Sequence, residues 1–143
     1  MTERPLLVVD GANVVGSVPD GWWRDRYAAA ERLRDALVPY ATAGLPADGP
    51  APPWTVGVPL DVVLVVEGAA RGVGSVPGVT VRSAPGSGDD LIAEVAAEAR
   101  ADESGHRGGA RPCLVVTADR GLRSRVVAVG ADVTGPRTVR RRP

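Results

Sequence analysis

The stretch LLVVDGANVVGS, residues 6–17, runs from four apolar residues straight into an acid, a glycine and an asparagine. Residues 5–9, PLLVV, form a short, continuously apolar run rich in valine and leucine, which is typical of a strand buried on both faces. Strands of this kind occur mainly in parallel sheets that helices cover on both sides. Asp10 would then stand at the carboxyl end of a buried strand, where open α/β sheets bind their ligands.

Apolar runs and helical patterns alternate through the rest of the chain. Further strands are predicted at 61–68, 78–83, 113–119 and 131–135. Helices are predicted at 22–41, 87–101 and 120–130. This alternation predicts an α/β fold with a parallel central sheet. Right-handed crossovers would bring the carboxyl ends of all its strands to one edge.

The composition is that of an ordinary globular domain, with 44% hydrophobic and 24% charged residues in a chain of 143. We expect one domain over 1–136, followed by a basic, disordered tail over 137–143. The proline- and glycine-rich segment 42–60 is expected to be a functional or mobile loop. No apolar run reaches the roughly 20 residues of a membrane span. With no signal-peptide pattern and with Cys113 the only cysteine, we expect a cytoplasmic protein.

Acidic residues follow most of the predicted strands. They are Asp10, Glu67, Asp89, Asp90 and Asp119. Carboxylates gathered at one edge repel one another unless they bind protons or a cation neutralises them. A donor set made only of oxygen favours Mg²⁺ or Mn²⁺. Such a site suits the in-line displacement of a phosphoryl group, in which metal ions activate water and stabilise the leaving oxygen.

Helix capping offers a second explanation for some of these acids. Asp89, Asp90 and Asp119 lie near predicted helix starts, where acids stabilise a helix by capping and through its dipole. Ser87 and Asp90 have the spacing of a capping box. Loops rather than obvious helix starts follow Asp10 and Glu67, so capping does not account for those two.

Three motifs, VVDGANVVG (8–16), GSGDDLIAEVAAEA (86–99) and VVTADRGLR (115–123), occur in an order that resembles NYN domains of the PIN-like nuclease superfamily, of the YacP-like type. The resemblance covers roughly residues 5–135. It implies a PIN-like three-layer α/β/α sandwich with a parallel sheet in the order 3-2-1-4-5. It also implies a metal-dependent ribonuclease that cleaves RNA phosphodiesters.

The same resemblance implies roles for individual residues. Asp10 would be the central metal ligand, Asp89 the second and Asp119 the third, each taking part in catalysis. Glu67 matches a position where an acid often stands and would complete the metal and catalytic set. Asn13 would contact substrate or orient a ligand; its other interpretation is an ordinary turn residue.

Around this set, Thr117 would offer a hydroxyl to the substrate, and Asp90 would be either a helper or only a helix cap. A haloacid-dehalogenase phosphatase would need an Asp at the position of Ala12, and the chain lacks it.

Basic residues gather in the last quarter of the chain. Residues 107–143 carry nine arginines and two acids, whereas residues 1–106 carry eight arginines and fifteen acids. A basic face can bind a polyanion, and Arg120, Arg123 and Arg125 beside Asp119 are the predicted substrate-binding arginines. A GC-rich coding sequence would also favour arginine, and a solvated helix face would explain this spacing as well.

Two tryptophans precede the first long helix. Trp23 is in phase with the apolar stripe of that helix and is predicted to lie in the core. Trp22 is out of phase, so it could pack against segment 42–60 or stack on a base beside the acidic edge.

These observations together favour a Mg²⁺- or Mn²⁺-dependent endoribonuclease with RNA as its partner, no membrane association and a homodimer as one possible assembly. Two alternatives stay open: a phosphoesterase acting on a small nucleotide, and a non-catalytic RNA-binding or interaction module.

Overall fold

The computed structural model describes residues 4–101 and 111–140. Within them, five parallel strands form one sheet in the order β3-β2-β1-β4-β5. The strands are β1 (Leu6–Asp10), β2 (Asp61–Val66), β3 (Val79–Ser83), β4 (Cys113–Val116) and β5 (Asp132–Thr134). The predicted α/β class and the strand order 3-2-1-4-5 are therefore confirmed.

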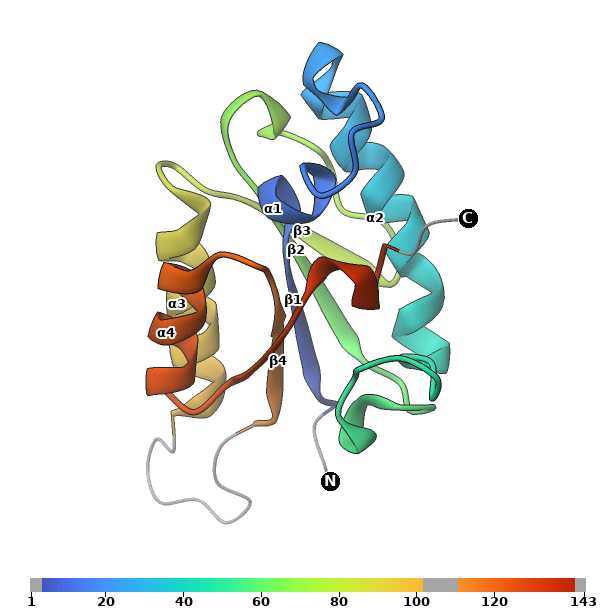
Figure 1. Cartoon of the computed structure of the whole chain (residues 1–143), viewed down its shortest axis with the longest axis vertical. Helices are drawn as coiled ribbons and strands as arrows, with labels where there is room; N and C mark the ends of the chain where they lie inside the picture. Colours follow the sequence, from blue (N-terminus) through green and yellow to red (C-terminus); the bar gives the residue numbers. More distant parts are fainter. Residues whose placement is uncertain (1–3, 102–110, 141–143) are drawn as a thin grey trace.

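Helices cover both faces of this sheet, giving three layers (Figure 1). The α-helices are α1 (Gly11–Val15), α2 (Arg26–Ala43), α3 (Gly88–Arg100) and α4 (Arg120–Ala128). The 3₁₀ turns are η1 (Trp22–Arg24), η2 (Pro53–Thr55), η3 (Gly68–Ala70) and η4 (Pro136–Thr138). Helix α2 lies on one face, α3 and α4 lie side by side on the other, and α1 stands at the carboxyl end of β1.

The central strand divides the core between the two faces, because successive side chains of a strand point to opposite sides. Leu7 and Val9 pack into the cluster that includes the buried side of α2. Leu6 and Val8 pack into the cluster formed with α3 and α4. All five residues of β1 are buried, which explains why its sequence is apolar without alternation until Asp10.

The predicted helix over 22–41 is interrupted near its start. Residues Trp22–Arg24 form the turn η1, and α2 begins only at Arg26. Asp25 separates the two, and its carboxylate accepts a hydrogen bond from the amide of Ala28 at 3.0 Å. An N-cap residue has non-helical dihedral angles, so the helical spacing does not extend back through Asp25.

This interruption changes the expected position of Trp23. Trp23 is 51% exposed, so its predicted place in the core is wrong. Trp22 is half-buried and packs against the core on the α2 side. The periodicity of α2 therefore does not predict which side of η1 faces inward.

Segment 42–60 is packed rather than freely extended. Helix α2 continues to Ala43, and Leu45, Thr55 and Leu60 are buried. Gly44 has φ +72°, and a Cβ there would lie 2.5 Å from the carbonyl oxygen of Val58, so only glycine fits this turn.

The packed chain also extends past residue 136. Thr138 and Val139 are buried, and Arg140 donates hydrogen bonds to the carbonyl oxygens of Val14 and Val15 at 3.1 and 2.7 Å. Arg140 also pairs with Asp20. The prediction of a disordered tail from residue 137 is therefore wrong for 137–140, and residues 141–143 lie outside the described part of the chain.

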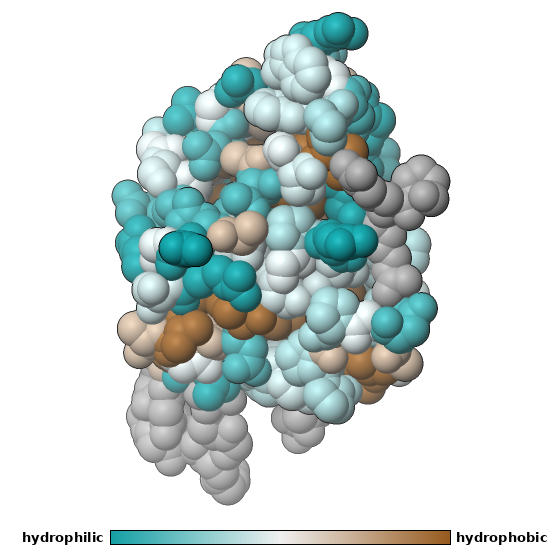
Figure 2. Space-filling view, in the orientation of Figure 1, coloured by the Kyte–Doolittle hydropathy of each residue, from teal (hydrophilic) through white to brown (hydrophobic). Residues whose placement is uncertain are grey.

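The face shown in Figure 2 is mostly hydrophilic or neutral, with apolar surface in separate small patches. Four large hydrophobic side chains are exposed among the described residues: Trp23, Tyr27, Val127 and Val129. In the same part of the chain, no helix is both long enough and apolar enough to cross a bilayer.

Candidate active site at the carboxyl edge of the sheet

Four acids come to the carboxyl edge of the sheet from four different segments. Asp10 ends β1, Glu67 follows β2, Asp89 is in the first turn of α3 and Asp119 precedes α4. Because β1 pairs with both β2 and β4, the segments that carry Glu67 and Asp119 lie on either side of Asp10.

Asp10 is the buried member of this group, with only 4% of its surface exposed. One carboxylate oxygen accepts a hydrogen bond from the Thr117 hydroxyl at 2.8 Å. The other accepts from the amide of Asn13 at 3.3 Å, so Asp10 is the N-cap of α1. The expectation that only a loop follows Asp10 is therefore wrong.

Gly11 is what allows α1 to begin directly after the strand. A Cβ at this position would lie 2.5 Å from the carbonyl oxygen of Val65 in β2. A larger residue would push α1 away from β2 and move the Asp10 carboxylate with it. This close approach explains why a glycine follows Asp10 in the stretch 6–17.

Asn13 and Thr117 join the segment after β1 to the segment after β4. The side-chain oxygen of Asn13 accepts a hydrogen bond from the amide of Ala118 at 2.8 Å. The Thr117 hydroxyl, fully buried, donates to Asp10 and accepts from the amide of Asp119 at 3.1 Å. Asp119 in turn caps α4 by accepting from the amide of Leu122 at 2.9 Å.

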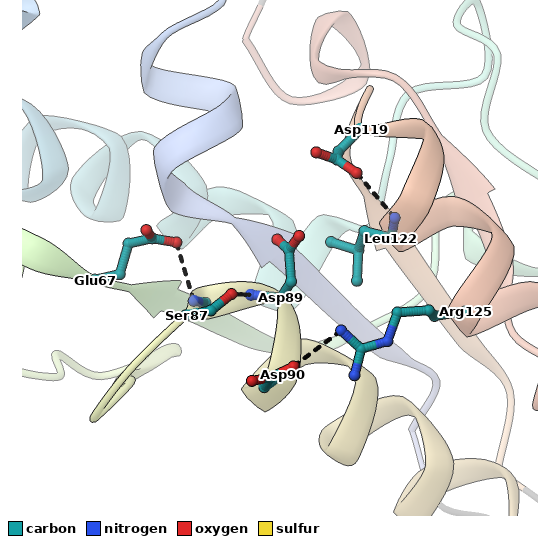
Figure 3. Close-up of polar contacts among 8 residues, drawn as sticks. Glu67, Ser87, Asp89, Asp90, Asp119, Leu122 and Arg125 are labelled. Atoms are coloured by element: carbon teal, nitrogen blue, oxygen red, sulfur yellow. Dashed lines mark hydrogen bonds and ion pairs between the residues drawn. The ribbon is translucent and has the colours of Figure 1, made fainter.

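Glu67 holds the start of α3. Its Oε1 accepts a hydrogen bond from the amide of Gly88 at 3.0 Å (Figure 3). A Cβ on Gly88 would lie 2.5 Å from that oxygen, so glycine leaves room for the carboxylate. Glu67 is thus a distant cap of a helix that begins 21 positions later.

Asp89 and Asp90 point in different directions. Figure 3 shows Asp89 between Glu67 and Asp119, whereas Asp90 turns to Arg125. The Asp90–Arg125 ion pair has an N···O distance of 3.0 Å. The α3 cap is made by Ser87, whose hydroxyl accepts from the amide of Asp89 at 3.1 Å. The expected capping-box role of Asp90 is wrong, because this carboxylate is committed to Arg125.

The charges of these acids act on one another. The pKa of Asp10 is raised, first by burial and then by the negative charges of Asp89 and Glu67, while the hydrogen bonds from Thr117 and Asn13 act in the opposite direction. The pKa of Asp89 is also raised, first by burial and then by the charges of Asp119 and Glu67. Both shifts show that the ionised carboxylates are disfavoured here, and a bound cation would offset their repulsion.

The donor chemistry fits Mg²⁺ or Mn²⁺, because every acid at the edge offers only oxygen. Within residues 4–101 and 111–140, however, no three acidic, histidine or cysteine side chains stand close enough together to form a ready-made metal site. The hydrogen bonds that Glu67 and Asp119 accept from helix amides hold the Glu67 carboxylate at the start of α3 and the Asp119 carboxylate at the start of α4. The acids thus have the donor atoms and the combined negative charge that suit a divalent cation. Their side chains are not gathered into a complete set of metal ligands.

The three predicted substrate arginines have different surroundings. Arg120 is exposed and begins α4, next to Asp119. Arg123 is half-buried one turn later, and its amide donates to the Asp119 carbonyl at 2.9 Å. Arg125 is paired with Asp90, which makes it the least available of the three for a phosphate.

A pocket of about 160 Å³ adjoins this edge, between α1, η1, α2 and the end of β2. Trp22, Arg26 and Glu67 contribute to its lining. Sequence reasoning singled out Trp22 and Glu67 but missed Arg26. The sequence pattern that points to Arg26 is the mixture of aromatic and basic residues in WWRDR, 22–26.

The fold and the edge define the class of domain: a three-layer α/β/α sandwich with parallel strands in the order 3-2-1-4-5 and carboxylates at its carboxyl edge. Two solved structures share this fold, both of Rae1 (YacP) from Bacillus subtilis. One superposes with a TM-score of 0.65 and 20% sequence identity, covering 93% of this chain and 70% of that one. The other, a tryptophan-to-leucine mutant, gives a TM-score of 0.61 and 20% identity, covering 94% and 72%.

The resemblance to YacP-like NYN domains is thereby confirmed at the level of the fold. No protein-family model matches the chain, and no curated protein matches its sequence.

Proposed function

We propose that this protein is a Mg²⁺- or Mn²⁺-dependent nuclease that cleaves RNA phosphodiesters at the carboxyl edge of its sheet. The observation that carries the proposal is the buried Asp10 carboxylate, which two hydrogen bonds hold in place while burial and the charges of Asp89 and Glu67 raise its pKa. The fold shared with Rae1 (YacP) supports it, because the NYN resemblance implies ribonuclease activity.

Asp10, Asp89 and Asp119 would hold the metal, with Glu67 in support. When bound, the metal would supply an activated water and charge stabilisation for the leaving oxygen. It would also relieve the repulsion among these carboxylates. Asp89 is suited to this role because the Ser87 hydroxyl caps its amide, leaving the carboxylate to project between Glu67 and Asp119 (Figure 3).

The residues around the acids would fix positions and contact the substrate. Thr117 holds one oxygen of Asp10, and Asn13 holds the turn before Asp119. Because the side-chain oxygen of Asn13 is engaged by Ala118, its amide nitrogen is the group that would donate to the substrate. Arg120 and Arg123 would attract the phosphates that flank the cleaved bond.

One alternative follows from a specific observation. Since no three acids are gathered as a ready-made ligand set in the described residues, the edge could serve an RNA-binding module without turnover. Such a module would bind RNA and leave it intact with either metal. A small-nucleotide phosphoesterase, the other alternative, would hydrolyse mononucleotides faster than oligonucleotides.

The deciding experiment follows a circular single-stranded RNA with Mg²⁺, with Mn²⁺ or with a chelator. Only an internal cut can linearise a circle, so linear product reports endonuclease activity. We expect linearisation with metal and none with chelator or with Asp10→Asn. Asp132→Asn, which neutralises an exposed acid at the start of β5, is the matched control and should cleave normally. An uncut circle together with a cut linear strand would indicate exonuclease action, and no cleavage of either would overturn the proposal.

A further inference from the structure

The pocket beside the acidic edge is large enough to hold an aromatic ring. It measures about 160 Å³, close to the roughly 150 Å³ of an apolar protein cavity that binds benzene. Its lining is mainly apolar, from Gly11, Ala12, Val15, Trp22 and Ala30 among others, with the charged side chains of Arg26 and Glu67 added. An apolar lining with a few polar groups is the usual composition of a ligand site.

The aromatic wall of this pocket is held in place. Trp22 packs against the core on the α2 side and meets Trp23 edge to face, with ring centroids 5.8 Å apart. The guanidinium carbon of Arg26 lies 5.2 Å from the centre of the Trp22 ring. Arginine on an aromatic ring is a combination that single-stranded nucleic acids use, because it offers a base both stacking and charge.

The pocket adjoins the acids directly. Gly11 and Ala12 belong to α1, whose N-cap is Asp10, and Glu67 belongs to both the pocket and the edge. A ring in the pocket would therefore be attached to a sugar and phosphate at the edge itself. The acids alone offer no contact to a base, whereas this pocket does.

We propose that this pocket takes one unpaired base of the RNA strand next to the phosphate that is cleaved. The inference rests on the proposed function for the identity of the polymer, although binding of a base can be measured without cleavage. Trp22 and Arg26 are the residues that would hold this base.

Two measurements test this pocket. The first titrates cytidine, uridine, adenosine and guanosine 5′-monophosphates, with ribose 5-phosphate as the probe that lacks a base, and follows tryptophan fluorescence. The second measures kcat/KM for a single-stranded RNA oligonucleotide in which one abasic residue is moved along the strand. The variants are Trp22→Leu and Arg26→Gln, and the control is Arg32→Gln, an exposed arginine of the same helix outside this pocket.

We expect the four nucleotides to bind and ribose 5-phosphate not to bind. We also expect the abasic residue to lower kcat/KM by about 5- to 150-fold at one position only, the range that loss of base stacking gives. Arg26→Gln and Trp22→Leu should flatten this positional dependence, while Arg32→Gln keeps it. Arg26 is exposed, so its variant tests the pocket even if Trp22→Leu fails to fold.

The possible failures are distinguishable. RNA cleavage with a flat abasic profile and no nucleotide binding would overturn the pocket and leave the nuclease intact. Nucleotide binding without any cleavage would retain the pocket and overturn the nuclease. Binding of ribose 5-phosphate as tight as that of the nucleotides would show that the base is not recognised and would overturn the pocket.

Discussion

At the scale of single residues, Asp10 combines two demands on one side chain. Its carboxylate oxygens cap α1 and accept a hydrogen bond from the Thr117 hydroxyl, so they stabilise the local structure. Its burial among other acids destabilises the ionised form. For an acid whose folded-state pKa is raised above its ordinary value of 3.8, the folded state holds the proton more tightly. The contribution of this proton to the stability of the folded state is fully present at pH values below 3.8. It is lost as the pH rises through the raised pKa of Asp10.

The first prediction concerns Asp10→Asn. Removing the charge relieves repulsion by Asp89 and Glu67, so it should raise the melting temperature of the metal-free protein slightly, and this gain should diminish as the pH is lowered and the native carboxyl takes up its proton. The same variant should lose cleavage and most of the rise in melting temperature that Mn²⁺ gives the native protein. Differential scanning fluorimetry across pH, with and without Mn²⁺, measures both effects.

The control for this prediction is Asp132→Asn, an exposed acid on β5. It should keep both the response to Mn²⁺ and the native cleavage rate. If Asp10→Asn cleaved at the native rate, Asp10 would have no part in the reaction. If Mn²⁺ left the native melting temperature unchanged, the metal assignment would fail.

The second prediction concerns Thr117, a positioning residue that acts through Asp10. Thr117→Val keeps the shape and removes the hydroxyl, leaving a buried carboxylate oxygen and the Asp119 amide without their partner. We expect a loss of about 1–3 kcal/mol in stability and a loss of about 10- to 100-fold in metal affinity or activity. Urea unfolding and Mn²⁺ titration measure the two effects.

Thr117→Ser restores the hydroxyl and should recover most of both. A purely structural role predicts a different result, in which Thr117→Val is less stable but binds Mn²⁺ with native affinity.

At the scale of elements, the start of α3 separates two neighbouring acids by function. Successive helix positions differ by about 100° in direction, so Asp89 projects toward the edge while Asp90 reaches Arg125 (Figure 3). The cap itself comes from Ser87 and from Glu67 across the loop. Both acids are near the helix N-terminus, yet only one lies among the other acids of the edge.

The third prediction compares the two acids. Asp89→Asn should abolish most cleavage with little change in stability, because its amide rather than its carboxylate is capped. Asp90→Asn removes one exposed ion pair, so we expect a loss of about 0.2–1 kcal/mol and near-native cleavage. Single-turnover cleavage and urea unfolding of both variants measure this.

Ser87→Ala is the positive control for the cap and should cost about 1 kcal/mol. If Asp90→Asn lost activity while Asp89→Asn retained it, the two assignments would have to be exchanged.

Local sequence patterns predicted the elements better than they predicted the site contacts. The run from Leu6 to Val9 identified a buried parallel strand, because both of its faces must be apolar. The place of Trp23 was not predictable in the same way, because the η1 turn breaks the helical phase at Asp25. Likewise, the Glu67–Gly88 contact joins residues 21 positions apart. Contacts of that kind depend on how the loops fold over the sheet edge, which no local periodicity encodes.

At the scale of the whole molecule, zero net charge conceals an uneven distribution. The chain has 17 basic and 17 acidic residues, yet the arginines of α4 lie directly beside the acids of the carboxyl edge. An acidic edge alone repels a phosphate backbone, so polymer binding requires a bound metal and flanking cations. Arg125 is already paired with Asp90, which leaves Arg120 and Arg123 as the arginines of α4 suited to this role.

The fourth prediction tests whether the substrate is a polymer. If RNA lies across this edge, its affinity should fall steeply with salt, because each neutralised phosphate releases counterions. Replacing Arg120 and Arg123 by Ala should reduce the slope of log K against log salt by about 0.7 for each phosphate of a single strand that is no longer neutralised. Cleavage of a dinucleotide should hardly change, since it lacks the flanking phosphates.

The matched control replaces Arg4, which precedes β1 at the opposite edge, and Arg32 of α2. This double variant should leave the salt slope unchanged. Fluorescence anisotropy of a labelled single-stranded RNA over a salt series measures these slopes. Equal slopes for all three proteins would make the α4 arginines a solvated helix face and favour a small-nucleotide substrate.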